Sequence, residues 1–449
     1  MTWFQPALDL LQSLRSAPPP DSRLRSFFSA ERPVCIARAP GRLDVMGGIA
    51  DYSGARVLEL PLECATFALV QAHDEPVCTV ASLRGDRWDF FTSDLPLAPP
   101  AQLAAWFRDR EADRWASYVV GVVQALRPAE ATAGLRILIH SSVPEGRGVA
   151  SSAALEVAVA VAVAATSSHR MNPADLAALC QRIENHVVGA PCGIMDQMTS
   201  ACGKQDRLLQ LQCQPGTIEG YIAVPPGYRF YGIDSGISHA VSGADYGTIR
   251  TAAFMGLRIL TTETPWRGGY LADLTPAEFS QFARSLPEEM TGAEFLERYG
   301  RISDTATVVR PDRRYPVRRA SEHPVGEQAR VDRFAPLLPT IAQQPDAANE
   351  LGQLMFASHQ SYSACGLGSE GTDRLVALVR AAGPEHGVFG AKITGGGSGG
   401  TVAVFGTREA EGCVREIAAR YAAETGRTAT VFTDSGPGAA ETGVLTVKP

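Results

Sequence analysis

The fold of this chain follows from one stretch, Pro144-Glu145-Gly146-Arg147-Gly148-Val149-Ala150-Ser151-Ser152-Ala153-Ala154. It comes directly after Leu135–His140, a run typical of a strand, and it opens the alanine-rich run Ser151–Ala165, which is typical of a buried helix. Glycines let the backbone turn tightly, and the first turn of a helix adds N–H groups that lack partners within the helix. The stretch therefore predicts a strand, an anion-binding loop and a helix in that order. An ordinary strand-to-helix turn with Ser151 as N-cap is the alternative.

Two further glycine segments lie on either side of this loop in the sequence. Ala39–Tyr52 follows a predicted strand and places Arg42 and Asp51 around a Gly-Gly turn; on its own it also suits a surface turn. In Gly390–Thr401, five of the six residues from Gly395 to Gly400 are glycine, and the segment enters a β-like run directly. This position favours a folded loop that approaches a ligand or another backbone over a flexible linker. None of the segments has the Walker A pattern.

A fourth segment, Gln181–Gln197, carries two acids in apolar surroundings. Glu184 belongs to a predicted amphipathic helix, and Asp196 follows a Pro-Cys-Gly turn between Met195 and Met198. A buried carboxylate needs a partner or a function, so both acids are candidates for a site. A helix cap or an ion pair is the alternative for each of them.

Composition excludes several classes of protein. The 449 residues are 45% hydrophobic and 20% charged, which indicates a globular protein of two or three domains. The net charge of −7 argues against broad binding to nucleic acid or to an anionic membrane. The longest apolar stretch, Val157–Ala165, is too short to span a bilayer.

The cysteines and the N-terminus favour a cytoplasmic protein. The nine cysteines are scattered, with no zinc-type spacing, so reduced thiols are expected. The first residues lack a basic region followed by an apolar run, so no signal peptide is predicted.

Alternating β-like and helical runs predict a mixed fold, either α/β or α+β. We expect a helical arm over residues 1–30, a first domain over residues 31–220 and a second domain over residues 221–449. The most basic stretch of the chain, residues 309–319, suggests a solvated loop, with closure over a substrate as the alternative. No pattern indicates an oligomeric state.

Together, the four segments resemble the galactokinase branch of the GHMP small-molecule kinases, in order and in approximate spacing. Cys192-Gly193-Ile194-Met195-Asp196-Gln197 matches the catalytic segment of galactokinases almost letter for letter, and Ser358-His359 matches a later landmark. The resemblance covers residues 34–435. It implies a two-domain α+β fold with the active site in the cleft between the domains. It also implies transfer of the γ-phosphoryl group of Mg·ATP to the C1 hydroxyl of a free monosaccharide.

The resemblance also implies roles for individual residues. Asp196 aligns with the catalytic aspartate, and Arg42 aligns with the arginine that keeps this aspartate ionised. The sugar-binding positions are Gly48, Ile49, Asp51, Gly193 and Tyr246. The ATP-binding positions are Trp115, Tyr118, Gly146, Gly148, Ser151, Ser152, Gly396 and Gly397. The Mg²⁺ ligands align with Ser152 and Glu184.

The chain departs from galactokinases at one point of the segment Ala39–Tyr52. Galactokinases read Gly-Glu-His-Thr-Asp-Tyr, and their Glu and His hold the C6 hydroxyl of galactose; here Gly48 and Ile49 stand at these positions. Asp51, the partner of the ring hydroxyls, is present. L-Arabinopyranose is the galactose ring without C6, and residues 37–54 are similar to the kinase part of plant L-arabinokinases. The sequence therefore predicts an L-arabinose 1-kinase.

Two other functions are open at this point. One is a galactokinase, or a kinase that accepts both galactose and arabinose. The other is a sugar and ATP sensor that has lost catalysis, against which Arg42, Ser152, Glu184 and Asp196 argue.

Overall fold

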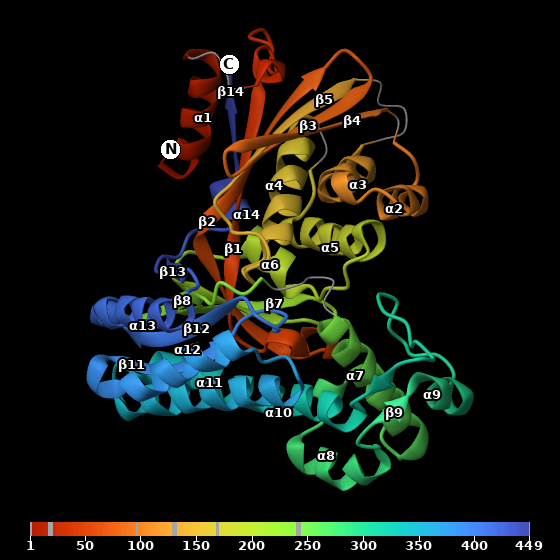
Figure 1. The fold of residues 1–449 in the computed structure, drawn as a ribbon, viewed down its shortest axis with the longest axis vertical. Coiled ribbons are helices and arrows are strands. Elements are labelled where there is room, and N and C mark those ends of the chain that lie inside the picture. The colour runs from red at the N-terminus through yellow and green to blue at the C-terminus, as the bar shows by residue number, and fades with distance from the viewer. Residues whose placement is uncertain are drawn as a thin grey trace.

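The computed structural model of the protein describes residues 2–16, 21–95, 97–127, 133–167, 170–238 and 244–448. A strand-rich upper half stands on a helix-rich lower half (Figure 1). The arm expected over residues 1–30 contains helix α1 (Gln5–Ser16), while residues 1 and 17–20 of it lie outside the described residues.

The upper half is built on one large sheet. Among the described residues it has eight strands in the order β14-β1-β2-β5-β3-β4, with β6 paired to β2 and β7 paired to β6. The strands are β1 (Val34–Met46), β2 (Arg56–His73), β3 (Val77–Arg84), β4 (Arg87–Asp94), β5 (Gly134–Ser141), β6 (Arg207–Gln212), β7 (Thr217–Ala223) and β14 (Val444–Val447). β3 and β5 run parallel, and the other pairs are antiparallel.

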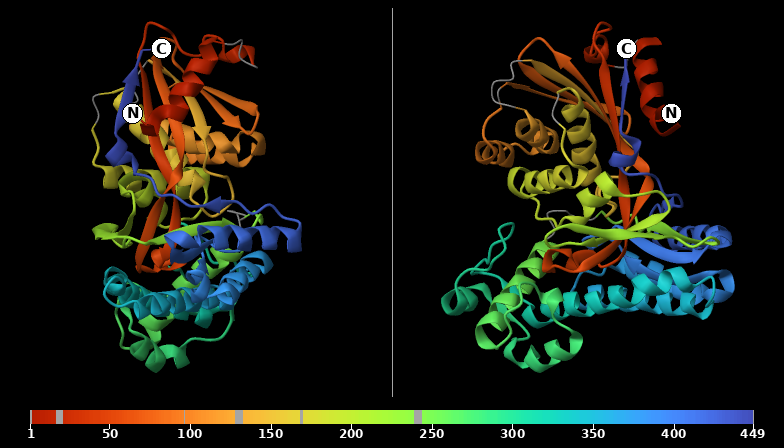
Figure 2. Two further views of the ribbon diagram at one scale, coloured as in Figure 1. Left: turned by 90° about the vertical axis from the view of Figure 1, so that its left-hand side faces the viewer. Right: turned by 180° about the vertical axis from the view of Figure 1, so that it is seen from behind.

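Helices cover both faces of this sheet (Figure 2). On one face lie α2 (Pro100–Arg108), α3 (Ser117–Leu126), α4 (Ser151–Ala165), α5 (Pro173–Ile183) and α6 (Met195–Cys202). Five alanines of α4 are buried, and their small side chains let this helix pack closely on β1 and β2: Ala153, Ala154, Ala158, Ala160 and Ala162. α1 packs on the opposite face, where Ile36, Leu69 and Leu138 point.

The lower half contains a second sheet of four strands among the described residues, in the order β11-β12-β8-β13. The strands are β8 (Tyr228–Asp234), β11 (Val388–Ile393), β12 (Thr401–Thr407) and β13 (Val431–Phe432). The helices beside it are α10 (Val317–Leu337), α11 (Asp346–Ala364), α12 (Glu370–Ala382) and α13 (Glu411–Thr425). α11 lies directly on β11, because a Cβ atom on Gly390 would lie only 2.3 Å from the Cα atom of Gly352.

A helical group completes the lower half. It comprises α7 (Ala244–Glu263), α8 (Pro276–Phe282), α9 (Gly292–Tyr299) and a short ribbon of β9 (Met290–Thr291) with β10 (Arg314–Tyr315). The basic stretch 309–319 is only partly a loop, since β10 and the start of α10 fall within it and Tyr315 is buried.

The two halves are not separated cleanly along the chain. The expected boundary at residue 220 falls inside β7, and the last elements, α14 (Ala439–Thr442) and β14, return to the first sheet. A buried ion pair joins the sheets, with Lys392 Nζ of β11 lying 2.6 Å from Asp44 Oδ2 of β1. The division into domains at residue 220 thus stays a prediction.

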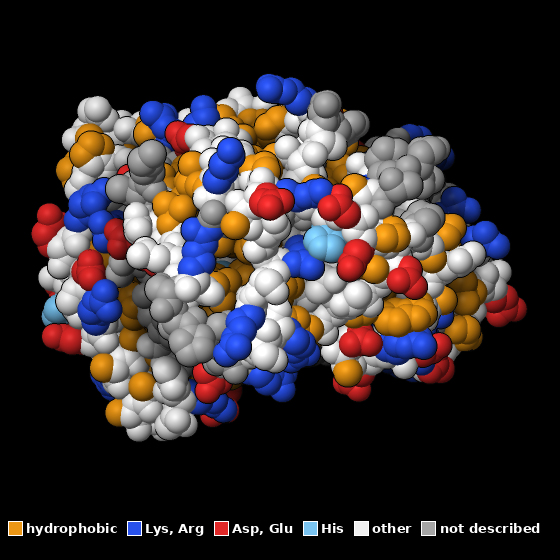
Figure 3. Space-filling view, turned by 90° about the horizontal axis from the view of Figure 1, so that it is seen from above, with side chains coloured by type: hydrophobic (Ala, Val, Ile, Leu, Met, Phe, Trp, Pro, Cys, Tyr) orange, Lys and Arg blue, Asp and Glu red, His pale blue; other side chains and the backbone are white. Residues whose placement is uncertain are grey.

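On the face shown in Figure 3, basic and acidic side chains are interspersed, without an extended area of one charge. Within the described part of the chain, no helix combines the length and the apolar composition that crossing a bilayer requires.

Candidate active site

Most of the predicted site residues line one open pocket between the two halves. It measures about 700 Å³, including solvent at its mouth. Its lining contains Arg42, Ile49, Asp51, Gly146, Gly148, Ser151, Ser152, Glu184, Gly193, Asp196, Tyr246 and Gly396. Segments that lie far apart in the sequence therefore meet at one place, as the resemblance implied.

Trp115 and Tyr118 line an adjoining pocket of about 840 Å³. Gly146, Ser151 and Ser152 belong to the lining of both pockets, so the two are continuous over the glycine loop. The aromatic residues thus lie on the far side of the loop from Asp196.

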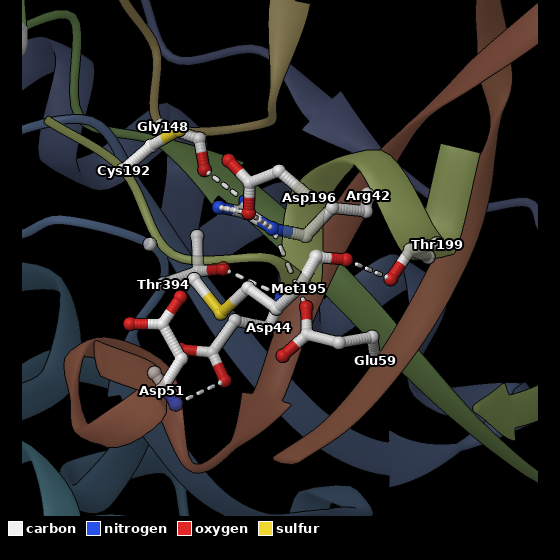
Figure 4. Close-up of polar contacts among 12 residues, drawn as sticks. Arg42, Asp44, Asp51, Glu59, Gly148, Cys192, Met195, Asp196, Thr199 and Thr394 are labelled. Atoms are coloured by element: carbon white, nitrogen blue, oxygen red, sulfur yellow. Dashed lines mark hydrogen bonds and ion pairs between the residues drawn. The ribbon is translucent and has the colours of Figure 1, made fainter. Parts of the chain in front are cut away.

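Arg42 and Asp196 form an ion pair at the centre of the first pocket (Figure 4). Arg42 Nε and Nη2 lie 2.9 and 2.8 Å from Asp196 Oδ1, and Arg42 Nη1 donates to the carbonyl of Gly148 at 2.7 Å. Burial alone would lower the pKa of the Arg42 guanidinium, but the carboxylates of Asp196, Glu59 and Asp44 outweigh it and raise that pKa. Arg42 is thus a permanent cation that lies between the acid and the glycine loop.

Glu59 of β2 is a member of this cluster that the sequence analysis missed. Its Oε2 lies 3.3 Å from Arg42 Nε, its side chain is fully buried, and neither carboxylate oxygen has a hydrogen-bond partner. Burial raises the pKa of Glu59 well above its usual range, and the neighbouring Asp44 adds to the shift. The signal in the sequence is one acid within the apolar run Val57–Leu62.

The glycine loop presents backbone N–H groups to both pockets. The N-cap of α4 is Ala150 in a left-handed conformation (φ 61°), with no side-chain hydrogen bond to the helix. The alternative reading of Ser151 as N-cap is wrong, because Ser151 is already the first helical residue. The first N–H groups of α4 therefore have no cap acceptor and suit an anion, such as a phosphate group.

The glycine loop Pro144–Ala154 and the segment Gly390–Thr401 pack against each other through their backbones. A Cβ atom on Gly400 would lie 2.9 Å from the carbonyl oxygen of Arg147, so glycine permits the approach. Thr401 Oγ1 also donates to this carbonyl at 2.8 Å. The segment Gly390–Thr401 thus supports the glycine loop and contributes Gly396 to the pocket.

Ser152 and Glu184 are the candidates for holding a divalent cation. Burial raises the pKa of Glu184 to about 7, and hydrogen bonds from Ser152 and Gln197 oppose that shift. Gln197 Nε2 lies 2.6 Å from Glu184 Oε2 and 3.4 Å from Oε2 of the buried Glu156. Gln197 and Glu156, which sequence reasoning did not select, therefore position the Glu184 carboxylate.

The described residues contain no group of three His, Cys, Asp or Glu side chains that could hold a metal ion by themselves. Mg²⁺ commonly takes one or two carboxylates from a protein and completes its shell with water and substrate phosphates. One carboxylate and one hydroxyl beside an anion-binding loop fit that requirement.

Asp51 lies at the opposite end of the pocket, where the sugar is expected. Burial raises its pKa to about 7, although the cation of Arg250 lowers it. A Cβ atom on Gly193 would lie 1.5 Å from Asp51 Oδ2, so a side chain at position 193 would displace the Asp51 carboxyl group. Arg250 is itself held by Asp304 through two hydrogen bonds of 2.8 Å. Asp304 lies between α9 and β10, so through this ion pair the helical group of the lower half supports the sugar end of the pocket.

Two predicted residues do not line either pocket. The Cα atom of Gly48 packs against Tyr362 of α11, and a Cβ atom there would lie 1.6 Å from the phenol oxygen. Gly397 packs against Leu367, where a Cβ atom would lie 2.8 Å from its side chain. Both glycines permit close packing beneath the pocket wall.

Comparison with known proteins identifies the family. Residues 117–204 match the GHMP kinase N-terminal domain, residues 344–423 the GHMP kinase C-terminal domain, and residues 22–72 the galactokinase galactose-binding signature. A galactokinase of Chloroflexus aggregans is 31% identical over 89% of this chain and 91% of its own length. The chain belongs to the galactokinase branch of the GHMP kinases. The kinase is a sugar kinase of this type, and its family implies ATP as phosphoryl donor.

The kinase is also similar to a plant L-arabinokinase and to a galactokinase of known structure. An L-arabinokinase of Arabidopsis thaliana is 38% identical over 94% of the kinase, which spans 47% of the plant protein. The crystal structure of Lactococcus lactis galactokinase complexed with galactose matches 93% of the kinase and 95% of that chain, with a TM-score of 0.75 and 20% identity. The predicted α+β GHMP kinase fold is thus confirmed.

Proposed function

We propose that this kinase phosphorylates L-arabinose at C1, giving L-arabinose 1-phosphate and ADP. The observation that carries the proposal is the wall of the pocket beside Asp51, where Ile49 presents an apolar side chain and Gly48 leaves no room for one. A galactose C6 hydroxyl placed there unpaired would lose about 1–3 kcal/mol, or roughly 5–150-fold in specificity. The similarity to a plant L-arabinokinase supports the same substrate.

The chemistry follows from the side chains at the centre of the pocket. The anomeric oxygen attacks the γ-phosphorus, the bond to the β,γ-bridging oxygen breaks, and the hydroxyl proton passes to Asp196 and then to solvent. The Arg42 guanidinium lies 2.8 Å from Asp196, pairs with this carboxyl group and offers positive charge to the transferred group. The N–H groups at the start of α4 hold the phosphates.

The magnesium ion would be held by Ser152 and Glu184, together with the nucleotide phosphates. When bound, the ion neutralises charge on the phosphate oxygens. Gln197 keeps the Glu184 carboxylate in place by its hydrogen bond of 2.6 Å. Trp115 and Tyr118 form the wall of the adjoining pocket, which suits the adenine ring.

Galactose phosphorylation is the second candidate. It is favoured by the galactose-binding signature over residues 22–72 and by Asp51 in the pocket lining, whose carboxyl oxygens suit hydrogen bonds from ring hydroxyls. The two sugars differ at C5, so the choice between them depends on the end of the pocket that Ile49 lines.

A coupled assay of ADP release over a panel of free sugars tests the proposal. We expect the highest kcat/KM with L-arabinose and a value lower by about 5–150-fold with D-galactose. Mass spectrometry of the product should find one phosphate on the sugar. A preference for galactose would refute the arabinose assignment, and ATP hydrolysis without a sugar phosphate would refute the kinase reaction.

The role of Asp196 is tested by Asp196→Asn. The amide cannot accept the proton, so kcat should fall by about 10²–10⁴-fold, while the folded protein still binds ATP. Asp175→Asn is the matched control, since Asp175 is exposed in the first turn of α5 and should leave kcat unchanged. Near-normal turnover in Asp196→Asn would overturn the assignment.

A further inference from the structure

We propose that Tyr362 sets the size of the sugar pocket at its Ile49 end and restricts it to pyranoses without an exocyclic carbon at C5. The inference rests on the proposed sugar 1-kinase function and adds a specificity-determining residue to it. Tyr362 lies 313 positions after Ile49 in the sequence and belongs to α11 of the lower half.

The phenol of Tyr362 connects two parts of the pocket wall. Its oxygen accepts a hydrogen bond from the N–H of Ile49 at 2.8 Å and donates one to the carbonyl of Gly395 at 3.1 Å. Ile49 and Gly396, which follows Gly395, both line the pocket. One hydroxyl group thus fixes the backbone on two sides of the same cavity.

The same oxygen occupies the space in which a side chain of residue 48 would begin. A Cβ atom on Gly48 would lie 1.6 Å from it, and the φ of Gly48 is 49°, which also favours glycine. Residue 48 therefore cannot send a polar group toward the sugar while Tyr362 is present. The two residues act as a pair that keeps this end of the pocket short and apolar.

The ring of Tyr362 is held firmly in this position. It is fully buried, His323 packs edge-on against it at 5.0 Å, and Lys392 Nζ lies 5.2 Å from the ring centre. Because the ring has no free space around it, it cannot move aside for a larger sugar.

Tyr362→Phe is the first test, with kcat/KM measured for L-arabinose, D-fucose and D-galactose. D-Fucose carries a methyl group where galactose carries CH₂OH, so it separates size from polarity. The wild type should discriminate against both hexoses. Tyr362→Phe removes two buried hydrogen bonds, so the backbone of Ile49 should lose its fixed position. We expect kcat/KM for L-arabinose to fall by about 10-fold. The preference for L-arabinose over both hexoses should fall by a similar factor.

Tyr231→Phe is the matched control. Tyr231 is also fully buried, and its hydroxyl also bonds two backbone groups, the carbonyls of Thr407 at 2.7 Å and Arg408 at 3.1 Å. It does not line the pocket, so this variant should lose thermal stability to a similar extent and keep the wild-type sugar preference. An unchanged preference in Tyr362→Phe would overturn the proposal.

A double-mutant cycle gives a second, independent test. Gly48→Ala should impair sugar phosphorylation severely in the wild type and less in the Tyr362→Phe background. There the closest clash, at 1.6 Å from the phenol oxygen, is absent, and the contacts at 2.7 Å to Cζ of residue 362 and 2.8 Å to Asp44 Oδ2 remain. The strain of φ 49° is present in both backgrounds and cancels. Additive losses would contradict the pairing of the two residues.

These outcomes are separate from the proposed function itself. A wild type that phosphorylates no sugar, or that prefers galactose, would overturn the proposed function before any variant is made. An arabinose-preferring wild type with an unaltered Tyr362→Phe preference would overturn the role of Tyr362 alone.

Discussion

Burial strongly alters the acidity of Asp51 at the sugar end of the pocket. Burial raises its pKa from 3.8 to about 7. The folded protein therefore binds this proton more tightly than the unfolded chain does. It follows that the contribution of Asp51 to stability is complete below about pH 4 and is lost as the pH rises through about 7.

Asp51→Asn should remove this dependence, because the amide stays neutral. Without ligands, we expect the variant to exceed the wild type in free energy of unfolding by a few kcal/mol at pH 8 and to match it near pH 4. Comparison with the wild type isolates Asp51 from Glu184, whose pKa is also raised to about 7. Urea denaturation at both pH values measures the difference, and parallel pH profiles would contradict it.

The same residue should give sugar turnover a pH dependence. An ionised Asp51 accepts hydrogen bonds from ring hydroxyls, so kcat/KM of the wild type for the sugar should rise as the pH increases through about 7. Asp51→Asn should have a low kcat/KM without this rise.

Single residues differ in how far the sequence predicts them. Asp196 is a candidate from the sequence because an acid in an apolar segment needs a partner or a function, whereas the role of Arg42 follows only from the resemblance to galactokinases. Tyr362 is not a candidate, because an aromatic residue in an amphipathic helix is ordinary core material and its contact with Gly48 exists only after folding. The resemblance to galactokinases assigns Gly48 to the sugar, whereas in the structure its Cα atom packs against this phenol.

Strand β1 illustrates what pairing adds to local pattern. The sequence predicts a strand over Val34–Ala37 followed by a turn, since Pro40 and Gly41 usually end a strand. In the structure β1 continues to Met46, with register shifts after Pro40 and Asp44, because β2 pairs with it along this length. This extension carries Arg42 into the pocket and Asp44 toward the second sheet.

The crossing of α11 over β11 depends on glycine in both elements. A Cβ atom on Gly352 would lie 2.0 Å from the carbonyl oxygen of Phe389, so Gly352→Ala must push the helix off the strand. We expect a loss of about 1–3 kcal/mol in unfolding free energy from overpacking. Gly412→Ala in α13 has open space and should be neutral or stabilising by up to about 1 kcal/mol. Equal stabilities for the two variants would contradict this account of the crossing.

On the scale of the whole molecule, the Asp44–Lys392 pair fastens the upper sheet to the lower one. Both side chains are fully buried, and Asp44 also accepts the N–H of Gly48 at 3.1 Å. Sequence alone could not predict this contact, because the two residues lie 348 positions apart and the residues around each of them do not indicate its partner.

Lys392→Met should destabilise the protein by about 3–5 kcal/mol, because it leaves the Asp44 carboxylate buried without its cation. Asp44→Asn combined with Lys392→Met removes both charges and should recover much of this loss. Thermal denaturation of the wild type, the single variant and the double variant provides the measurement. A double variant no more stable than Lys392→Met would show that the charge of Asp44 is not the cause.

The helix α1 and the strand β14 come from opposite ends of the chain and meet at one edge of the upper sheet. Leu445 and Val447 pack into the same apolar cluster as Phe4 and Leu11, and both termini lie at the top of the molecule in Figure 1. A short engineered peptide could therefore join the two termini. The new chain ends could then be placed in the β3–β4 hairpin at Gly85, which is exposed. Such a circular permutant would keep both sheets and the pocket between them, with its new ends on the rim of the upper half.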